Sequence, residues 1–301
     1  MRILVTGANG LVGSRLTALL ARRGHAMTLL GRGPRRTAGE HDYHPVDLAD
    51  EAALTAVVRA ARPEVIVNPG SMTDVDGCES APAEAFRVNG IAPGILALAA
   101  RDLGAHLVHV STDYVFDGEA GPYAEDAIPN PRGVYALTKH IGEQAVQALG
   151  ASWAIARTAV VYGWPPAGRP NFGSWLLVAL RKGEPVRLFE DQFVSPSLAG
   201  SVAEQLTELA ERRLTGRWNV CGAAVVNRVQ FGQALCAEFG LDPHAIVPSR
   251  LAEAKLKSPR PARSGLRTDK AFAQLSARPL ALDAALERFH RDVEADEGAG
   301  A

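Results

Sequence analysis

Residues 3–13 read ILVTGANGLVG, a short apolar run that leads directly into glycines at positions 7, 10 and 13. The apolar run predicts a buried strand, and the apolar spacing after Gly13 predicts a helix. Gly7 allows a tight turn, Gly10 lets the backbone approach a pyrophosphate, and Gly13 permits close helix packing. The stretch therefore predicts a dinucleotide-binding turn with the anion at the helix N-terminus, and an ordinary glycine loop is the alternative.

The same alternation continues through the first 160 residues, where short apolar runs are separated by longer segments at helical spacing. This order is typical of a parallel sheet with helices on both faces. The runs are continuously apolar, as expected of strands that are covered on both sides. We therefore predict an α/β fold with a doubly wound parallel Rossmann sheet. The expected strands are 3–6, 27–30, 65–68, 107–111 and 154–158.

The pattern changes after residue 163, where a stretch rich in proline and glycine begins. We predict a dinucleotide-binding Rossmann domain over 1–161 and a smaller C-terminal substrate-binding region over 162–197 and 223–291. The segment 198–222 combines a helical spacing with a short apolar run, and we expect it to return to the main sheet. The acidic residues 292–301 are expected to form a flexible tail.

Composition excludes several classes of protein. The 301 residues carry 32 basic and 33 acidic side chains, and this balance gives no reason to expect nucleic acid or a membrane as a partner. The three cysteines are widely spaced and lack the short pairs that hold zinc, so we expect a reducing compartment and no metal. No apolar run reaches about 18 residues, which favours a cytoplasmic protein.

The second predicted strand is followed by a basic residue. An acidic residue at this point would accept the ribose 2′-hydroxyl of NAD, whereas here Arg32 follows, with Arg35 and Arg36 close behind. A guanidinium can pair with a 2′-phosphate, so the sequence favours NADP(H), with NAD(H) and a merely solvated basic loop as alternatives. Asp47 and Leu48 are placed to meet the adenine, although Asp47 is also suited to cap a helix.

Residues 135–139 read YALTK inside a long helical pattern, so Tyr135 and Lys139 share one helix face. A tyrosine is a weak acid at neutral pH, and a nearby ammonium group is expected to move its pKa toward the working range. Such spacing also occurs by chance on exposed helices. Here, however, an earlier strand ends in Ser111 and Thr112, at the edge where open α/β sheets bind ligands. Together these features predict a hydride-transfer site.

With these motifs in view, the chain resembles the extended short-chain dehydrogenase/reductase family, and within it the dTDP-4-dehydrorhamnose reductases. The resemblance covers nearly the whole chain, and its most specific segments are STDYVFDG and DQFVSP. The matching motifs are TGANGLVG (6–13), TDVDGCE (73–79), VN (88–89), STDYVFDG (111–118), YALTKHIGE (135–143), RTAVVYG (157–163), NF (171–172), DQFVSP (191–196) and RPARSGL (260–266).

The resemblance implies an NADP(H)-dependent reductase of a 4-keto-6-deoxy sugar attached to a nucleoside diphosphate. It implies that Thr112 bonds the substrate carbonyl, that Tyr135 donates the proton and that Lys139 binds the nicotinamide ribose. The implied cofactor-binding residues are Gly7, Asn9, Gly10, Leu11, Val12, Arg32, Asp47, Leu48, Asn68, Ser71, Asn89, Ser111, Tyr135 and Lys139. The implied substrate contacts are Thr73, Val75, Asp113, Tyr114, Asn171, Phe172, Gln192 and Arg260. A homodimer is expected by analogy alone.

Several alternatives stay open at this point. The triad does not fix the substrate, so the chain could reduce another carbonyl compound. It could also be an NADP-binding regulatory subunit like that of methionine adenosyltransferase, which shares some of these motifs. Asp74, Asp76 and Glu79 are expected to serve as loop and helix-cap residues rather than as metal ligands. Three arginines, at 260, 263 and 267, could clamp a diphosphate or form a solvated basic stretch.

Overall fold

Seven parallel strands form the central sheet of the computed structural model, which describes residues 1–37, 39–165 and 170–299. The strand order, β11-β6-β5-β4-β1-β2-β3, confirms the predicted doubly wound sheet. The strands are β1 (Arg2–Val5), β2 (Ala26–Gly31), β3 (Asp42–Pro45), β4 (Val65–Asn68), β5 (His106–Thr112), β6 (Trp153–Thr158) and β11 (Gly216–Asn219). The half-exposed edge strand β3 was not among the expected strands.

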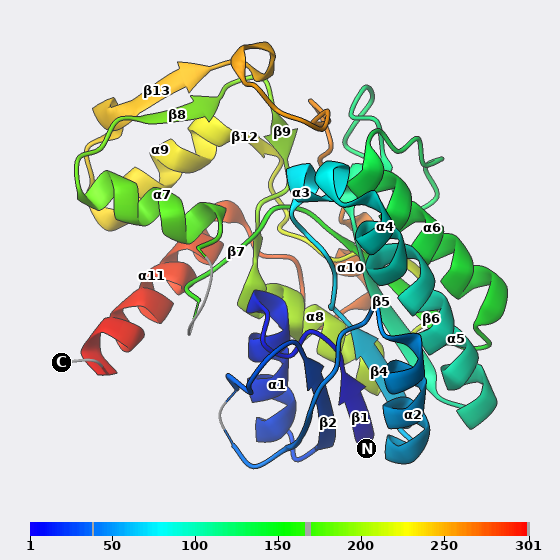
Figure 1. The fold of residues 1–301 in the computed structure, drawn as a ribbon. Helices are drawn as coiled ribbons and strands as arrows, with labels where there is room; N and C mark the ends of the chain where they lie inside the picture. The colour runs from blue at the N-terminus through cyan, green and yellow to red at the C-terminus, as the bar shows by residue number, and fades with distance from the viewer. Residues whose placement is uncertain (38, 166–169, 300–301) are drawn as a thin grey trace.

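Helices cover both faces of this sheet (Figure 1). On one face α1 and α8 pack over Ile3 and Val5 of β1, and on the other face α2, α5 and α6 pack over Leu4. Successive side chains of a strand point to opposite faces, so an uninterrupted apolar strand serves both layers. These helices are α1 (Leu11–Arg22), α2 (Glu51–Ala61), α5 (Ala92–Leu103), α6 (Val134–Leu149) and α8 (Ala199–Glu211).

A second, smaller core lies beside the C-terminal edge of the sheet. Its aromatic centre is Tyr162, whose ring meets those of Phe231 and Phe289 edge-on. Three helices enclose it, and three two-stranded pairs, β7-β10, β8-β13 and β9-β12, complete the region (Figure 1). The elements are α7 (Phe172–Arg181), α9 (Arg228–Phe239), α11 (Leu282–Ala299), β7 (Val161–Tyr162), β8 (Val186–Phe189), β9 (Phe193–Val194), β10 (Ser197–Leu198), β12 (Val226–Asn227) and β13 (Ile246–Ser249).

The segment 198–222 contributes both a helix and an edge strand to the main sheet, because α8 packs on α1 and β11 pairs in parallel with β6. Shorter helical elements also occur between the strands and the longer helices. They are α3 (Val75–Ser80), α4 (Pro82–Ala85), the π-helix η1 (Phe86–Ile91), α10 (Asp269–Gln274) and the 3₁₀-helices η2 (Asp113–Val115), η3 (Pro243–Ala245) and η4 (Leu251–Glu253).

The predicted flexible tail is wrong over most of its length. Helix α11 continues to residue 299, and Val293 within it is fully buried in the smaller core. Two acidic residues of this segment bind other elements: Asp292 pairs with Arg15, and Asp296 accepts a 2.7 Å hydrogen bond from the Trp164 indole. The acidic composition therefore marks the exposed face of an anchored helix.

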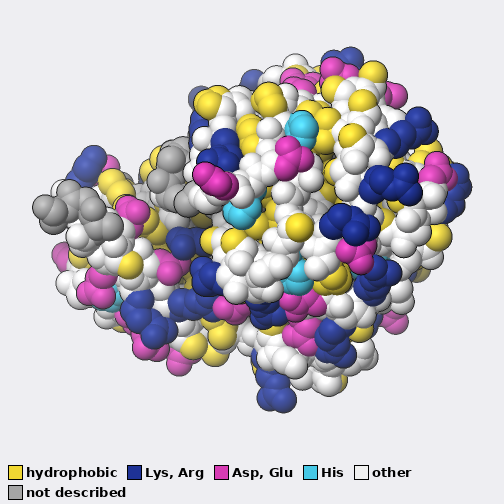
Figure 2. All heavy atoms as spheres, turned by 90° about the horizontal axis from the view of Figure 1, so that it is seen from below, with side chains coloured by type: hydrophobic (Ala, Val, Ile, Leu, Met, Phe, Trp, Pro, Cys, Tyr) yellow, Lys and Arg dark blue, Asp and Glu magenta, His cyan; other side chains and the backbone are white. Residues whose placement is uncertain are grey.

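Charged side chains of both signs are interspersed on the face shown in Figure 2. No helix in residues 1–37, 39–165 and 170–299 combines the length and apolarity needed to cross a membrane. The cysteine thiols, Cys78, Cys221 and Cys236, are buried and not joined in disulfides.

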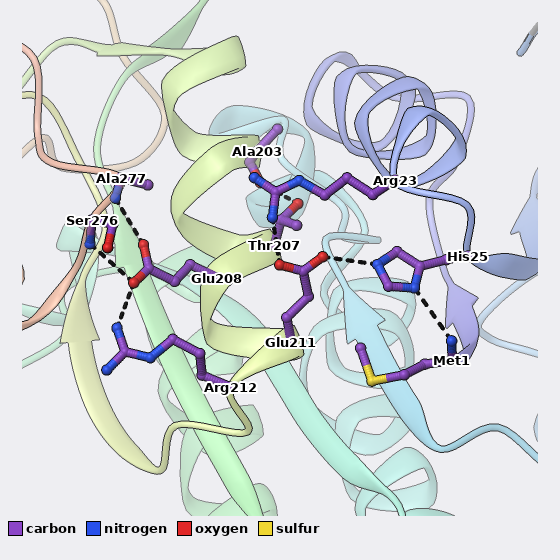
Figure 3. Close-up of polar contacts among 10 residues, drawn as sticks. All are labelled: Met1, Arg23, His25, Ala203, Thr207, Glu208, Glu211, Arg212, Ser276 and Ala277. Carbon is purple, nitrogen blue, oxygen red and sulfur yellow. Dashed lines mark hydrogen bonds and ion pairs between the residues drawn. The ribbon is translucent and has the colours of Figure 1, made fainter.

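The C-terminal end of α8 is fastened by two carboxylates that point in different directions (Figure 3). Glu211 faces α1, where it binds Arg23 and lies 2.8 Å from Nε2 of His25. Glu208 faces the other way and accepts the backbone N–H groups of Ser276 at 3.0 Å and Ala277 at 2.7 Å. Burial opposes ionisation of Glu208, but these backbone donors and the Arg212 guanidinium together outweigh it, and its pKa is lowered. Glu208 thus ties the chain after α10 to the main sheet.

We predict that Glu208→Gln lowers the free energy of unfolding by about 1–2 kcal/mol at neutral pH, because an amide is a weaker acceptor than a carboxylate and also presents a donor to two N–H groups. A lowered pKa means that the carboxylate's contribution is present above the unfolded pKa of about 4.3 and is lost as the pH falls through the folded value. The difference in the free energy of unfolding between the wild-type protein and Glu208→Gln, measured by denaturant titration, should therefore become smaller in acid.

Glu204→Gln is the matched control on the same helix. Glu204 pairs with Arg288 at the surface, with about a third of each side chain exposed, so its loss should cost less than about 1 kcal/mol. Equal effects of the two substitutions would show that the backbone contacts of Glu208 do not set its contribution.

Candidate active site

The glycine turn joins β1 to α1 at the C-terminal edge of the sheet. Gly7 has a positive φ of 56°, and Gly10 precedes the helix as its N-cap. A Cβ at Gly13 would lie 2.1 Å from the Gly7 carbonyl oxygen, so only glycine lets the helix approach this closely. The first helical bond runs from Ser14 to Gly10, which leaves the N–H groups of Leu11 and Val12 directed out of the helix end. This cradle fits a diphosphate.

Asn9 organises the basic loop after β2. Its amide nitrogen donates to the carbonyls of Arg32 and Pro34 and to the Tyr43 hydroxyl, and its oxygen accepts the N–H of Arg36. The Asn9 side chain thus positions the loop. The Arg32 side chain is 69% exposed, and its one ion pair among the described residues is with Glu84, at 3.7 Å, so it is available to a phosphate beside the turn.

Three other predicted cofactor residues have duties within the protein. Asp47 accepts the N–H of Ala49, and Asp50 caps α2, so Asp47 stabilises the turn before the helix. Leu48 is buried, and its side chain lies against Gly70. Asn68 is fully buried and bonds the Thr6 hydroxyl and, at 3.0 Å, Nδ1 of His109. Both polar atoms of the Asn68 side chain therefore have protein partners.

Asn89 holds the loop that follows β4. Its oxygen accepts the Ser71 hydroxyl and the N–H of Met72, both at 2.9 Å, and its nitrogen donates to the Met72 carbonyl. Asn89 lies in the π-helix η1, an irregularity that often marks functional sites. Asn89 therefore joins the loop to the helical layer, and the predicted supporting network is present around it.

Thr112 and Tyr135 meet at the C-terminal end of β5. Thr112 is the last residue of the strand, and its hydroxyl donates to Asp113 at 3.1 Å and accepts the N–H of Tyr114. Tyr135, in the first turn of α6, is buried. Burial raises the pKa of Tyr135, while a hydrogen bond with Thr112 acts in the opposite direction. The tyrosine therefore remains protonated at neutral pH, as a proton donor must.

Lys139 lies one helical turn after Tyr135 and is almost completely buried. Its ammonium donates a 2.7 Å hydrogen bond to the Val110 carbonyl of β5. Burial lowers the pKa of Lys139 to about 8, although Glu143 raises it in part. The expectation that Lys139 lowers the tyrosine pKa is not met in the protein alone, because burial of the Tyr135 phenol dominates.

Ser111 and Asp113 flank Thr112 and are both buried. The Ser111 hydroxyl has no hydrogen-bond partner among the described residues. Asp113 binds the hydroxyls of Thr112 and Ser264, and burial raises its pKa to about 6 despite these bonds. This end of β5 thus combines an unpaired hydroxyl with a carboxyl group that is hard to ionise, beside the proposed proton donor.

The predicted substrate residues divide into two groups. Val75 and Tyr114 pack beside Tyr135, and the Tyr114 ring meets the Tyr135 ring edge-on with centroids 5.8 Å apart. Asn171 is occupied elsewhere: it caps α7 and donates a 2.7 Å bond to the Gly163 carbonyl. A substrate role for its side chain is therefore not supported. Thr73 is exposed on the loop before α3.

The arginines of the RPARSGL segment lie in different surroundings. Arg260 is only 14% exposed and bonds Asp76 at 3.0 Å, whereas Arg267 is 56% exposed and pairs with Asp269. Arg263 is exposed. Only Arg260 is buried near the predicted substrate residues, so the three arginines do not form one clamp.

The acidic residues of the TDVDGCE segment have the structural duties that we predicted. Asp74 caps α3, Asp76 binds Arg260, and Glu79 accepts the N–H of Val134 at the start of α6 at 2.8 Å. Among the residues that the structure describes, no group of three or more potential ligand side chains could hold a metal ion.

Comparison with known proteins identifies the family. The profile described as RmlD substrate binding domain matches residues 1–294. The chain belongs to this family. It is 38% identical over 280 residues to a dTDP-4-dehydrorhamnose reductase of Streptomyces griseus, with 92% of this chain and 83% of that protein covered. It is 35% identical over 298 residues to a probable low-salt glycan biosynthesis reductase, Agl14, of Haloferax volcanii, with 97% and 99% covered.

A solved structure supports the same family assignment. The dTDP-4-dehydrorhamnose reductase from Bacillus anthracis, solved in complex with NADP, superposes with a TM-score of 0.87 at 25% identity. The match covers 96% of this chain and 98% of that one. The resemblance to extended short-chain dehydrogenases/reductases and to dTDP-4-dehydrorhamnose reductases is therefore confirmed.

Two residues of this RmlD-family site were missed from sequence. Ser264 bonds the buried Asp113, and Arg228, the first residue of α9, bonds Gln192 at 3.0 Å. Ser264 lies in the RPARSGL segment, so the matching motif indicated that it is close to the site but gave it no role. Arg228 follows Asn227 at a helix start, where it reads as an ordinary exposed residue. Only the fold brings it to Gln192.

We predict that Lys139→Met abolishes turnover but raises the free energy of unfolding by about 1–2 kcal/mol at neutral pH, because it removes a buried ammonium. Because the pKa of Lys139 is lowered, keeping its ammonium charged in the folded protein costs stability, and this cost is fully present below a pH of about 8. That cost fades as the pH rises toward the ordinary lysine value of 10.5. The stability difference, measured by denaturant titration, should therefore shrink in alkali.

Lys182→Met is the control, because Lys182 is 64% exposed and its removal relieves no buried charge. Two results would contradict the cost assigned to the buried ammonium. One is a Lys139→Met protein that is less stable than the wild type at neutral pH, and the other is a stability difference between them that does not depend on pH.

Proposed function

We propose that this protein is an NADPH-dependent reductase of a nucleotide-linked 4-keto-6-deoxy sugar, with Tyr135 as the proton donor. The observation that carries the proposal is the convergence of Thr112, Tyr135 and Lys139 at the C-terminal end of β5. This end of the sheet is also where the glycine turn places a diphosphate-binding helix N-terminus, in agreement with ligand binding at the carboxyl edge of open α/β sheets.

The relatives support the substrate class. The Streptomyces griseus relative is named as a reductase of dTDP-4-dehydrorhamnose, and a Streptomyces niveus protein, 34% identical over 261 residues, as a reductase of dTDP-4-keto-6-deoxy-D-glucose. Both substrates carry a ketone at C4 of a deoxysugar joined to a nucleoside diphosphate. We therefore propose a sugar nucleotide of this class as the substrate.

The residues present fit a dinucleotide. Gly7, Gly10 and Gly13 leave room for a diphosphate, Leu11 and Val12 offer backbone N–H groups to it, and Arg32 can reach a 2′-phosphate. When bound, NADPH supplies the hydride that reduces the C4 carbonyl. The structure of the Bacillus anthracis relative with NADP supports this choice of cofactor.

The protein's own groups handle the proton. Burial keeps Tyr135 protonated, so its hydroxyl can donate to the oxygen of the substrate carbonyl as negative charge develops there. Thr112 lies beside that hydroxyl and can hydrogen-bond the same oxygen. Lys139 is held by the Val110 carbonyl one helical turn after Tyr135, where its ammonium can bind the ribose of the nicotinamide.

We also propose a cellular location and an assembly state. The free, buried thiols support a reducing compartment such as the cytoplasm. We also propose a homodimer formed through a pair of helices. Exposed apolar side chains on helices, such as Leu137, Trp175 and Val178, are candidates for that contact. Light scattering on the purified protein measures the mass directly.

The function is tested by following the loss of NADPH absorbance with an enzymatically generated dTDP-4-keto-6-deoxy sugar, beside reactions with NADH and without sugar. We expect turnover that depends on the sugar. Tight NADPH binding without turnover would instead direct the search to other carbonyl substrates or to a partner enzyme.

We predict that Tyr135→Phe lowers kcat by roughly 10²–10⁴-fold, because phenylalanine cannot donate the proton. The dissociation constant for NADPH, measured by fluorescence titration, should change less than about twofold, because the cofactor turn is untouched. Tyr123→Phe is the control: the Tyr123 hydroxyl bonds Asp117, in a loop outside the triad. Near-normal turnover by Tyr135→Phe would disprove the assigned role.

We also predict that Arg32→Asp weakens NADPH binding by more than tenfold and NADH binding by much less, because only NADPH carries the 2′-phosphate that a guanidinium recognises. Arg101→Asp is the charge-matched control, on an exposed arginine at the end of α5. Equal losses for the two cofactors would remove Arg32 from the 2′-phosphate site.

A further inference from the structure

Arg228 lies next to the predicted substrate residues without an ion-pair partner. Its Nε donates to Oε1 of Gln192 at 3.0 Å, and its guanidinium stacks over the Phe172 ring, 4.5 Å from the centroid. Among the described residues, no carboxylate lies within salt-bridge distance of Arg228. The charge is therefore positioned by a neutral amide and an aromatic ring, and neither of them neutralises it.

Two hydrogen-bond donors at this place remain unused. Arg228 Nη1 and Gln192 Nε2 are both buried and have no acceptor among the described residues. Gln192 is only 2% exposed, so solvent does not satisfy its amide. Leaving a buried donor unpaired is unfavourable, and it is more so where the donor is charged. Two unpaired donors on adjoining side chains indicate that a ligand supplies the acceptors.

The ligand that these donors suit is an anion. Burial lowers the pKa of Arg228, and the positive charge of Arg260 lowers it further, whereas Tyr114 and Asp113 raise it. The Arg260 charge therefore acts against that of Arg228, although Arg260 also pairs with Asp76. An anion between two guanidinium groups would remove that repulsion and accept from the unused donors.

The position of this anion relative to Tyr135 specifies its source. Arg228 contacts Gln192 and Phe172, two of the predicted substrate residues, and it interacts electrostatically with Tyr114, whose ring meets the Tyr135 ring edge-on. In a nucleoside diphosphate sugar, the diphosphate at C1 lies across one sugar ring from the ketone at C4. The cofactor diphosphate, in contrast, belongs at the glycine turn before α1.

We propose that Arg228, oriented by Gln192 and Phe172, binds the diphosphate of the sugar-nucleotide substrate together with Arg260. This assignment rests on the proposed function for its substrate class. It gives Arg228 a role in substrate affinity, since the guanidinium contacts a group that does not change during the reaction. The chemistry of the reduction remains with Tyr135.

The test compares binding of thymidine, dTDP and NADPH to the wild-type protein and to Arg228→Gln by calorimetry. We expect Arg228→Gln to weaken dTDP binding by about ten- to a hundredfold, the equivalent of one or two charged hydrogen bonds. Thymidine and NADPH binding should change less than about twofold. For a sugar nucleotide that the enzyme reduces, the KM of Arg228→Gln should rise by a similar factor, while its kcat should change little.

Two further variants separate binding from folding. Arg228→Lys keeps the charge without the planar fork and should recover part of the dTDP affinity. Arg250→Gln removes an exposed arginine of the same region, paired with Glu190, and should leave dTDP binding unchanged. Thermal unfolding of each variant checks that the fold is intact.

Three outcomes would overturn the proposal: equal weakening of thymidine and dTDP, unchanged dTDP binding in Arg228→Gln, or a wild-type protein that binds no nucleoside diphosphate. The result for the wider function is separate. Turnover of a 4-keto sugar with a normal KM in Arg228→Gln would refute the role of Arg228 alone. An Arg228-dependent affinity for dTDP without such turnover would refute the reaction and keep the diphosphate site.

Discussion

The close approach of two backbone segments, the turn at Gly7 and the loop at Gly70, fixes the geometry of this protein. A Cβ at Gly7 would lie 2.7 Å from the Cα of Gly70, so neither side chain nor solvent separates the ends of β1 and β4. The Thr6 hydroxyl stabilises the contact, because it accepts a 3.1 Å hydrogen bond from the Gly70 N–H and donates one to the Asn68 side chain. Because these strands are neighbours in the sheet, the contact places the cofactor turn beside the loop that leads to the substrate region.

Side-chain hydrogen bonds connect the contact between Gly7 and Gly70 to the helix that bears the reacting groups. Asn89 bonds the loop at Ser71 and Met72, and it lies 3.4 Å from the Thr138 hydroxyl on α6. Thr138 immediately precedes Lys139, whose ammonium bonds β5. The helix bearing Tyr135 is therefore positioned by the loop after β4 and by strand β5 together.

The parts of the structure that sequence predicted are those fixed by local rules. Glycine spacing at 7, 10 and 13, apolar strands and the four-residue spacing of Tyr135 and Lys139 each act within one element, and the structure has the predicted elements. The sequence was less informative where tertiary contacts decide. Asn171 matched a motif that did not signal its capping of α7, and the acidic segment after 292 continues helix α11, in which Val293 is buried. Arg228 gave no signal, because its partners come from distant segments.

Several energetically unfavourable groups of this protein lie at the carboxyl edge of the sheet. Lys139 is a buried ammonium, Asp113 is a buried carboxyl whose pKa is raised, and the Ser111 hydroxyl and the Arg228 guanidinium each lack a protein partner for a buried polar atom. Elsewhere a buried charge is matched, as where Arg157 forms two hydrogen bonds to Glu143. Uncompensated groups reduce stability, and a bound ligand that pairs with these groups would offset that cost at this edge. Buried polar atoms without a partner in the described part of the chain also occur elsewhere, such as His106 Nε2 and the Tyr162 hydroxyl, so these groups support the site in combination with the glycine turn and the Tyr135–Lys139 helix.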